Sequence, residues 1–285
     1  MKLPYITTKQ AEILKLLYTF RFLDRIQLQA FMNHKDKRRV LAWLKDLREK
    51  QHLEWIYSTD FAEKMKPAIY YLGINGIRYL KTLEWDDDST IYPIEELRKR
   101  YKEADRSRTF VDRSLLVADC CLALKAVNGA NNGTNSSKVT YSYVTEAEYI
   151  DSDHEYHFLA ELEVLRPNLC IVKQEQKRGE DEPVTTNYLL EIFDSTLPRY
   201  RMRRRLKGYV TYLDDREWES SEPEPIILLV CPSITELVYA KRATKKLIED
   251  TYEDDLHVRF TTAELLKRES VTVELWEEGK LRYGL

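Results

Sequence analysis

The stretch that decides the fold reads AELEVLRPNLCIVKQ (160–174) and, after a charged connection, NYLLEIFDSTLPRYRMRRRLKGYVTYL (187–213). Each piece contains an apolar run with alternation, residues 161–172 and 187–193, and these runs predict neighbouring strands of one sheet. The connection between them is charged and contains a glycine and a proline. We therefore expect a solvated turn there.

A helix follows the second strand, and its two sides differ in character. Its apolar positions are spaced three and four apart, as in a helix with one buried side; they are Leu206, Tyr209, Val210 and Leu213. Basic residues at i, i+4 and i+8 form a stripe along the other side; they are Arg199, Arg203 and Lys207. Acidic residues gather at the strand ends, namely Glu161, Glu163, Glu191 and Asp194. This combination indicates a nuclease-like active site, or a scaffold that keeps the nuclease-like fold without the catalytic activity.

Length and composition indicate two domains of ordinary size. The chain has 285 residues, of which 43% are hydrophobic and 33% charged, enough for real cores under a highly charged surface. No apolar run approaches the ~20 residues that a membrane helix needs, and the N-terminus lacks the features of a secretory signal. The four cysteines lie in apolar runs without CxxC spacing, which predicts small buried thiols in a reducing compartment. We expect a cytoplasmic protein with no membrane association.

Charge is distributed unevenly along the chain. Of the 45 Lys and Arg and 48 Asp and Glu, residues 1–84 hold 16 and 9, so this segment carries +7 and the remainder −10. A basic N-terminal third on an acidic body suggests that the first segment meets a polyanion.

The first fifty residues predict three helices. Thr7 or Thr8 caps the first, Asp24 the second and Asp36 the third. The side chains expected to face inward are Ile13, Leu16, Leu17 and Phe20, then Ile26, Leu28 and Phe31, then Val40, Leu41, Leu44 and Leu47. A short turn separates the second and third helices, as in a helix-turn-helix.

The residues that follow complete a winged helix. Residues 53–57 and 68–72 predict two short strands joined by a polar, basic tip, and residues 75–83 predict a helix packed behind them. The third helix is then expected to lie in the DNA major groove with its N-terminal residues nearest the bases. The DNA-binding residues expected on this helix and at the wing tip are Lys35, Lys37, Arg38, Arg39, Lys45, Lys64 and Lys66. The alternative is a solvated helix face on a protein-binding or dimerisation module.

The domain organisation is expected as follows. Residues 1–84 form the winged-helix domain, residues 85–106 a linker with some helical character, and residues 107–285 an α/β domain. The second domain is predicted as helix, strand, strand, strand, helix, strand, helix and a final strand pair at 257–261 and 271–276. This is the element order of the PD-(D/E)xK nuclease core.

Three motifs resemble the replication-relaxation family of plasmid and mobile-element proteins. They are YYLGINGIRYL (70–80), the helix RSRTFVDRSLLVADCCLALKA (106–126), and RPNLCIV (166–172) followed by LLEIFDST (189–196). The resemblance implies a winged-helix DNA-binding domain joined to a nuclease-like domain, acting in plasmid replication or transfer. It also implies double-stranded DNA as a partner, together with a relaxase or replication protein, and leaves self-association into a homodimer open.

The candidate catalytic residues depart from the nuclease pattern. Position 168 is Asn where the motif asks for Asp, and Phe193 occupies the position of the motif's Lys. An active site would need Mg²⁺ held by acidic oxygens, and the candidates for it are Glu161 or Glu163, Asn168, Glu191 and Asp194, with Arg205 or Lys207 in place of the Lys. The competing interpretation pairs Glu191 and Asp194 with Arg199 or Arg203 in structural ion pairs.

The sequence therefore favours a DNA-binding protein of a plasmid or conjugative element, with its nuclease-like domain as a platform for DNA or protein and no cofactor. Arg199 and Arg203 are expected to extend the DNA contact onto that domain. The alternatives are a metal-dependent endonuclease or nickase with a displaced active site, and a dimeric transcriptional regulator.

Overall fold

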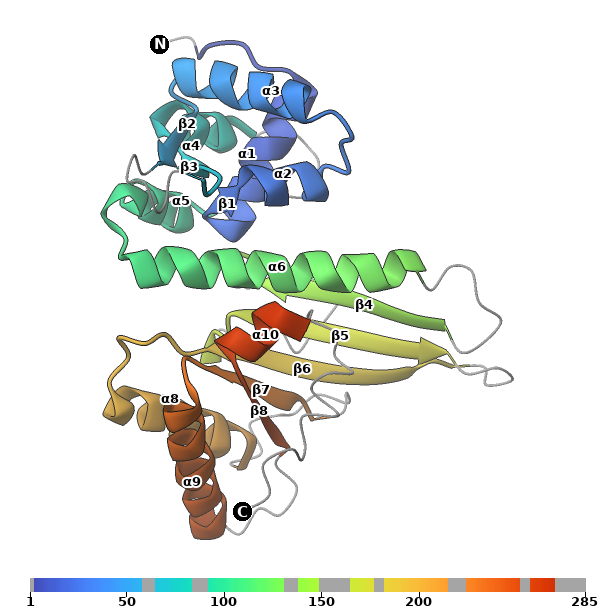
Figure 1. Cartoon of the computed structure of the whole chain (residues 1–285), viewed down its shortest axis with the longest axis vertical. Helices are drawn as coiled ribbons and strands as arrows, with labels where there is room; N and C mark the ends of the chain where they lie inside the picture. The colour runs from blue at the N-terminus through green and yellow to red at the C-terminus, as the bar shows by residue number, and fades with distance from the viewer. Residues whose placement is uncertain are drawn as a thin grey trace. The chain divides into compact units, whose positions relative to one another are not determined.

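The chain folds into two mixed units of helices and strands, Met1–Leu122 and Ala123–Leu285, each with a sheet of its own (Figure 1). The computed structural model describes residues 3–57, 65–83, 92–130, 138–148, 165–176, 182–214, 224–251 and 257–269. Within these residues, no helix combines the length and the apolar character that crossing a membrane requires.

Three helices open the first unit at the predicted caps. They are α1 (Thr8–Phe20), α2 (Arg25–Phe31) and α3 (Lys37–Glu49). The side chains of Thr7, Asp24 and Asp36 each accept a hydrogen bond from a backbone N–H of the first turn. At the first two caps, the side chain of the glutamine at the third helical position accepts a hydrogen bond from the backbone N–H of the cap residue, which completes a capping box.

Two inward positions were predicted incorrectly. Ile26 is 55% exposed and Leu41 is 39% exposed. In α2 the buried side chain is that of Gln27 instead of Ile26. Its amide is satisfied there, because it donates to Asp119 Oδ1 at 2.7 Å and to the carbonyl of Leu115 at 2.9 Å. In α3 the buried stripe is the narrow i, i+4, i+7 set, and Leu41 lies outside it; the stripe is Val40, Leu44 and Leu47.

The predicted hairpin forms the first sheet. Its strands are β2 (Leu53–Ile56) and β3 (Ile69–Leu72), and α4 (Ile74–Thr82) follows them. The antiparallel order is β1-β3-β2, where β1 (Leu23–Asp24) is a two-residue strand too short to leave a periodic signal in the sequence.

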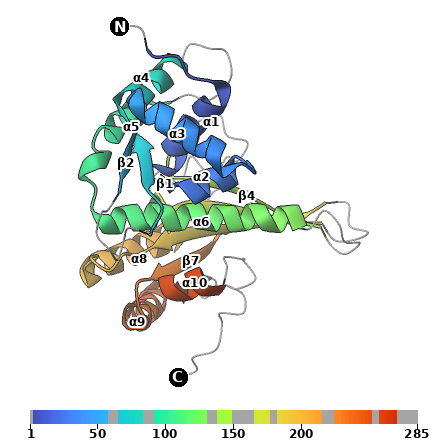
Figure 2. The same ribbon diagram turned by 45° about the horizontal axis from the view of Figure 1, so that its top comes forward.

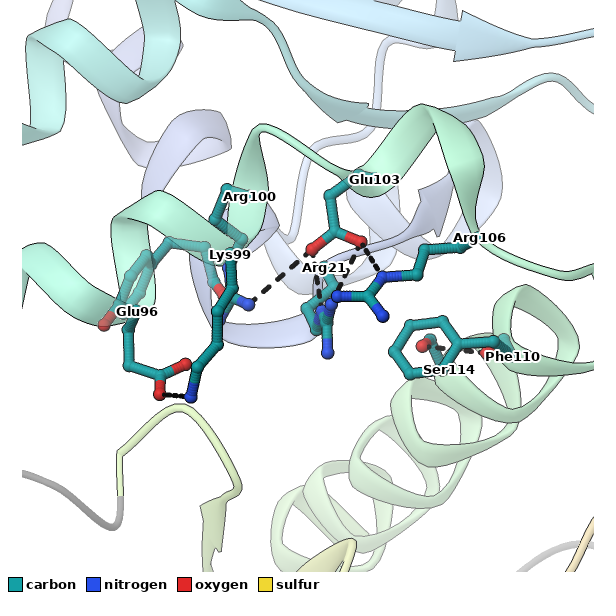
Figure 3. A network of polar contacts seen from close by, with 9 residues as sticks. Arg21, Glu96, Lys99, Arg100, Glu103, Arg106, Phe110 and Ser114 are labelled. Carbon is teal, nitrogen blue, oxygen red and sulfur yellow. Dashed lines mark hydrogen bonds and ion pairs between the residues drawn. The ribbon is translucent and has the colours of Figure 1, made fainter.

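The residues after the hairpin pack into the same unit. They form α5 (Ile94–Arg100), a 3-10 helix η2 (Glu103–Asp105) and α6 (Arg108–Ala130), which continues into the second unit. The fully buried Glu103 accepts hydrogen bonds from Arg21 at 2.8 and 3.1 Å, and Arg100 and Arg106 lie 3.6 and 3.5 Å from it (Figure 3). Three arginines around one carboxylate thus tie η2 to the end of α1.

A five-stranded mixed sheet forms the second unit. The strands are β4 (Lys138–Thr145), β5 (Leu169–Gln176), β6 (Val184–Ile192), β7 (Ile226–Cys231) and β8 (Val258–Thr262), in that order across the sheet. The first three are antiparallel, and β6, β7 and β8 are parallel. The parallel pairs are connected by α8 (Arg199–Asp214) and α9 (Ile234–Thr251), and α10 (Ala263–Glu269) follows β8.

Three features of this unit differ from the sequence-based expectation. Strand β5 begins at Leu169, although residues 165–168 were expected to belong to it. Residues 173–176, expected in a turn, extend β5, and residues 173–175 pair with residues 184–186, because a long hairpin keeps its polar distal end in register with its apolar base. The helix α10 was not predicted. Outside the described residues lie the expected strand segment 161–164 and the expected last strand 271–276.

The main core of the second unit lies between the sheet and one pair of helices. Helices α8 and α9 lie side by side along one face of the sheet in both views (Figures 1 and 2). Their buried side chains, Met202, Leu206, Tyr209, Val210, Ala240 and Leu247, pack on strand residues that include Val172, Leu189 and Leu229. All four cysteines are buried free thiols, as predicted, and burial raises the pKa of Cys231 to about 12.

Candidate functional site

The exposed N-terminus of α3 concentrates positive charge. Lys35, Lys37, Arg38 and Arg39 are all exposed, and none of them forms an ion pair with another residue that the structure describes. The one acid among them, Asp36, is occupied by the backbone N–H groups of Arg38 and Arg39 at 2.8 and 3.4 Å. Further along the helix, Lys45 lies 3.8 Å from Glu49 in an exposed pair. The four cations at the helix start are therefore available to a ligand.

The C-terminal end of α3 is fixed by the turn before α4. The N–H of Gly73 donates to the carbonyl of His52 at 2.9 Å, and the N–H of Asn75 donates to that of Gln51 at 3.0 Å. A Cβ atom at Gly73 would lie 2.6 Å from the carbonyl oxygen of Gln51, and one at Gly76 would lie 2.3 Å from that of His52. Only glycine allows this approach, so the segment that carries the first family-like motif fixes the position of the basic helix.

Aromatic side chains lie beside the same helix. Arg48 of α3 stacks its guanidinium 3.8 Å from the centroid of Trp55, and the Trp55 ring stacks on Tyr57 at 5.4 Å. Trp55 is 40% exposed and Tyr57 44%. This surface was not predicted from the sequence; the available signal was a pair of aromatics at i and i+2 at the end of the edge strand β2. Of the wing-tip residues, Lys66 is exposed and Lys64 lies outside the described residues.

The end of β6 holds the central polar cluster of the second unit. The buried Glu191 carboxylate accepts hydrogen bonds from Arg205 Nε at 3.0 Å, from Arg205 Nη2 at 2.9 Å and from the Tyr209 hydroxyl at 2.6 Å. Arg205 Nη2 also donates to the carbonyl of Arg166 at 2.6 Å. The structural partner of Glu191 is therefore Arg205, and the expectation of Arg199 or Arg203 was wrong, because Arg205 and Tyr209 lie one turn apart on the side of α8 that faces β6.

The electrostatics of this cluster stabilise the ion pair. Burial disfavours the charged form of Arg205, but the Glu191 carboxylate and Tyr209 outweigh that effect and raise the pKa of the guanidinium. Burial, reinforced by Glu191, raises the pKa of Tyr209 well above its usual range, so the hydroxyl stays a donor. In this arrangement the carboxylate is fully engaged.

Among the other candidate catalytic residues, Asn168 lies beside Glu191 and bonds the backbone on either side of it. Asn168 is close in the sheet, where its Oδ1 accepts the N–H of Ile192 at 2.7 Å and its own N–H donates to the carbonyl of Leu190 at 2.9 Å. Asp194 caps the turn after β6 by accepting the N–H of Thr196 at 2.8 Å. Phe193, in the position of the motif's Lys, is buried in the core.

Two further candidates lie elsewhere. Lys207 is exposed and lies about 200° around α8 from Arg205. Glu161 and Glu163 lie outside the described residues. Within the described residues, no group of three His, Cys, Asp or Glu side chains is placed to hold a metal ion.

The basic stripe of α8 is exposed. Arg203 has no ion-pair partner among the described residues, whereas Arg199 lies 3.8 Å from Glu236 and its guanidinium 5.1 Å from the ring centroid of Tyr239. Arg199 of the stripe thus contacts the neighbouring helix α9, whereas the partner of Glu191 is Arg205, which lies outside the stripe.

One comparison with known proteins gave a match. A family model described as "Replication-relaxation" matches residues 14–223, well over half of the chain, and spans both units. No curated protein and no solved structure matches the chain.

Proposed function

The chain belongs to the replication-relaxation family, and on this premise we propose that it is a DNA-binding protein of a plasmid or mobile element, acting in replication, relaxation or conjugative transfer. The observation that carries the proposal is the set of four exposed cations at the N-terminus of α3, which have no acidic partner among the described residues. Lys and Arg clustered on one helix are the electrostatic footprint of nucleic-acid binding.

A winged-helix assignment for the first unit supports this proposal. The order α1, β1, α2, α3, β2, β3 and the antiparallel β1-β3-β2 sheet agree with that fold. In it, α3 is the recognition helix, whose first turn meets base edges in the major groove. Arg38 and Arg39 then read guanine, whereas Lys35, Lys37 and Lys45 neutralise phosphates together with Lys64 and Lys66 of the wing.

The second unit is proposed as a nuclease-like scaffold that serves as a platform. Its order α6, β4, β5, β6, α8, β7, α9 and its half-antiparallel, half-parallel sheet agree with the PD-(D/E)xK core. Two of the motif's three roles are altered, since Asn168 bonds the backbone of β6 and Phe193 is core. Arg205 of α8 places a positive charge beside Glu191, as the motif's Lys would. In this ion pair it acts as a structural partner of the carboxylate.

The test measures the affinity of the full chain for a duplex that the protein itself selects from a random library. Arg38→Ala and Arg39→Ala are each expected to weaken binding by about 1–3 kcal/mol if the residue contacts a base. The matched control is Lys15→Ala, which removes an exposed cation from α1 and is expected to bind as the wild type does. Unchanged affinity in both arginine variants would remove α3 from the interface.

A metal-dependent nickase is the second candidate, because Glu191 lies at a strand end beside a cation. It predicts nicking of supercoiled plasmid with Mg²⁺ or Mn²⁺ that Glu191→Gln abolishes. If the wild type binds the plasmid and leaves it intact under both metals, the scaffold interpretation stands and the nickase is rejected.

A further inference from the structure

The second unit carries a strongly basic surface on α8 and α9. From Arg199 to Tyr212, α8 contains five arginines, one lysine and no acidic residue. Helix α9 adds two adjacent pairs of cations, Lys241 with Arg242 and Lys245 with Lys246. All of these basic side chains except Arg205 are exposed.

The beginning of α8 contacts the N-terminal half of α9. The Tyr239 hydroxyl donates to the carbonyl of Arg199 at 3.4 Å, and Arg199 reaches Glu236 at 3.8 Å. Because β6, β7 and β8 are parallel, α8 and α9 are successive crossover helices on one face of the sheet, and their axes cross in Figures 1 and 2.

Four exposed cations follow these contacts in sequence, two on each helix. Arg203 and Lys207 lie about 6 and 12 Å beyond Arg199 on the same side of α8. Arg242 and Lys246 lie about 4.5 and 10.5 Å beyond Tyr239 on the same side of α9. We call Arg203, Lys207, Arg242 and Lys246 the α8–α9 seam.

The charges of the seam are not neutralised within the described chain. None of its four residues forms an ion pair with another described residue. The nearby acids have other partners, since Glu236 lies by Arg199 and Glu249 lies 3.8 Å from Lys245. Like charges on two neighbouring helices repel each other, and a polyanion bound to them removes that repulsion.

We propose that the α8–α9 seam binds the sugar–phosphate backbone of duplex DNA. The inference rests on the proposed function, because it adds a second contact with DNA to that of α3. Arginine forks bind phosphate in a bidentate manner and lysine binds it as a point charge. A single strand is a poorer fit, since single strands are held by stacked aromatics and Tyr200 is the one exposed aromatic on the described parts of α8 and α9.

The experiment compares two full-length variants that remove four cations each. The seam variant is Arg203→Gln, Lys207→Gln, Arg242→Gln and Lys246→Gln. The control is Lys138→Gln, Lys241→Gln, Lys245→Gln and Lys267→Gln, all exposed residues of the second unit outside the seam. Fluorescence anisotropy measures Kd for the selected duplex, a scrambled duplex and a single strand, between 50 and 300 mM KCl, which are chosen conditions spanning about a sixfold range.

The seam predicts a change in salt dependence. Four phosphate contacts contribute about 3.6 to the slope of log Kd against log salt, so the seam variant loses up to that amount while the control keeps its slope. Affinity falls by the same factor for selected and scrambled duplexes, because backbone contacts carry no sequence information. The charge-retaining variant Arg203→Lys with Arg242→Lys keeps the wild-type slope.

The outcomes separate this inference from the proposed function. If Arg38→Ala loses selectivity while the seam variant keeps the wild-type slope and affinity, the seam is rejected and the α3 interface stands. If the seam variant loses affinity only for the single strand, the duplex assignment is wrong. If the wild type binds none of the three probes, the proposed function and the seam fall together.

Discussion

Replacing Glu191 by Gln tests whether the cluster at the end of β6 stabilises the second unit. The substitution keeps the shape of the side chain but removes its charge. Arg205 then loses the counterion that it contacts at 2.9 and 3.0 Å, and the Tyr209 hydroxyl faces an amide instead of a carboxylate.

The expected loss is about 3 kcal/mol. Removing one partner of a buried ion pair costs about 3–5 kcal/mol, because the other charge stays without compensation. The lower end applies here because the Arg205 side chain is 31% exposed and water can reach it. For a unit of this size, 1 kcal/mol shifts Tm by about 2–4 °C, so Tm is expected to fall by roughly 6–12 °C.

Calorimetry and far-UV circular dichroism measure the transition, with Glu224→Gln as an exposed control that is expected to leave it unchanged. A double-mutant cycle adds the single variants Glu191→Leu and Arg205→Met and the double variant that combines them. The double variant is expected to recover most of the loss, since an apolar pair of similar volume replaces a buried ion pair at little cost. Additive losses in the cycle, or a Glu191→Gln protein as stable as the wild type, would refute the coupling.

Three further predictions concern the first unit. Glu103→Gln leaves Arg21, Arg100 and Arg106 without their shared buried carboxylate, and we expect a loss of about 3–5 kcal/mol in urea unfolding, whereas an unchanged midpoint would contradict the network. Gly76→Ala sets a Cβ 2.3 Å from a carbonyl oxygen and is expected to lower Tm and weaken DNA binding together, whereas Gly208→Ala, which meets open space in α8, is expected to gain up to about 1 kcal/mol. Burial lowers the pKa of His52, so the unfolded chain takes up a proton first as pH falls below about 6.5. The free energy of unfolding then falls by up to about 1.4 kcal/mol for each pH unit. When Tm is measured from pH 7 to 5, we expect it to fall less steeply in His52→Leu than in the wild type.

Local signals predicted the helices and the hairpin well. Caps such as Asp24 and Asp36, and the alternation in residues 187–193, act over a few residues and can be read directly from the sequence. The Glu103 network could not be predicted, since Arg21 and Glu103 are 82 positions apart and ordinary surface charges look the same in a sequence. Burial of a polar Gln27 in place of Ile26 likewise depends on a partner, Asp119, on a distant helix.

The candidate site was predicted in part for a related reason. Sequence spacing placed acids at strand ends and cations on the next helix, but the rotation of α8 decides which arginine meets Glu191. Arg199, Arg203 and Arg205 have the same chemistry, and only packing of Leu206 and Tyr209 into the core turns Arg205 toward β6. The seam depends in turn on two helices that are adjacent only in the folded sheet.

Under the proposed function, Gly73, which caps α4, and Gly76, in its first turn, give a way to find related chains that bind other DNA sequences. Gly73 and Gly76 are required by the main-chain oxygens of Gln51 and His52, which follow α3. Chains that change their target site would exchange Arg38 and Arg39 and still need both glycines. A genome search could therefore require Leu-Gly-x-x-Gly after a strand and leave the first turn of the preceding helix free to vary. We expect it to find relatives that hold this helix in the same position and recognise different DNA sequences.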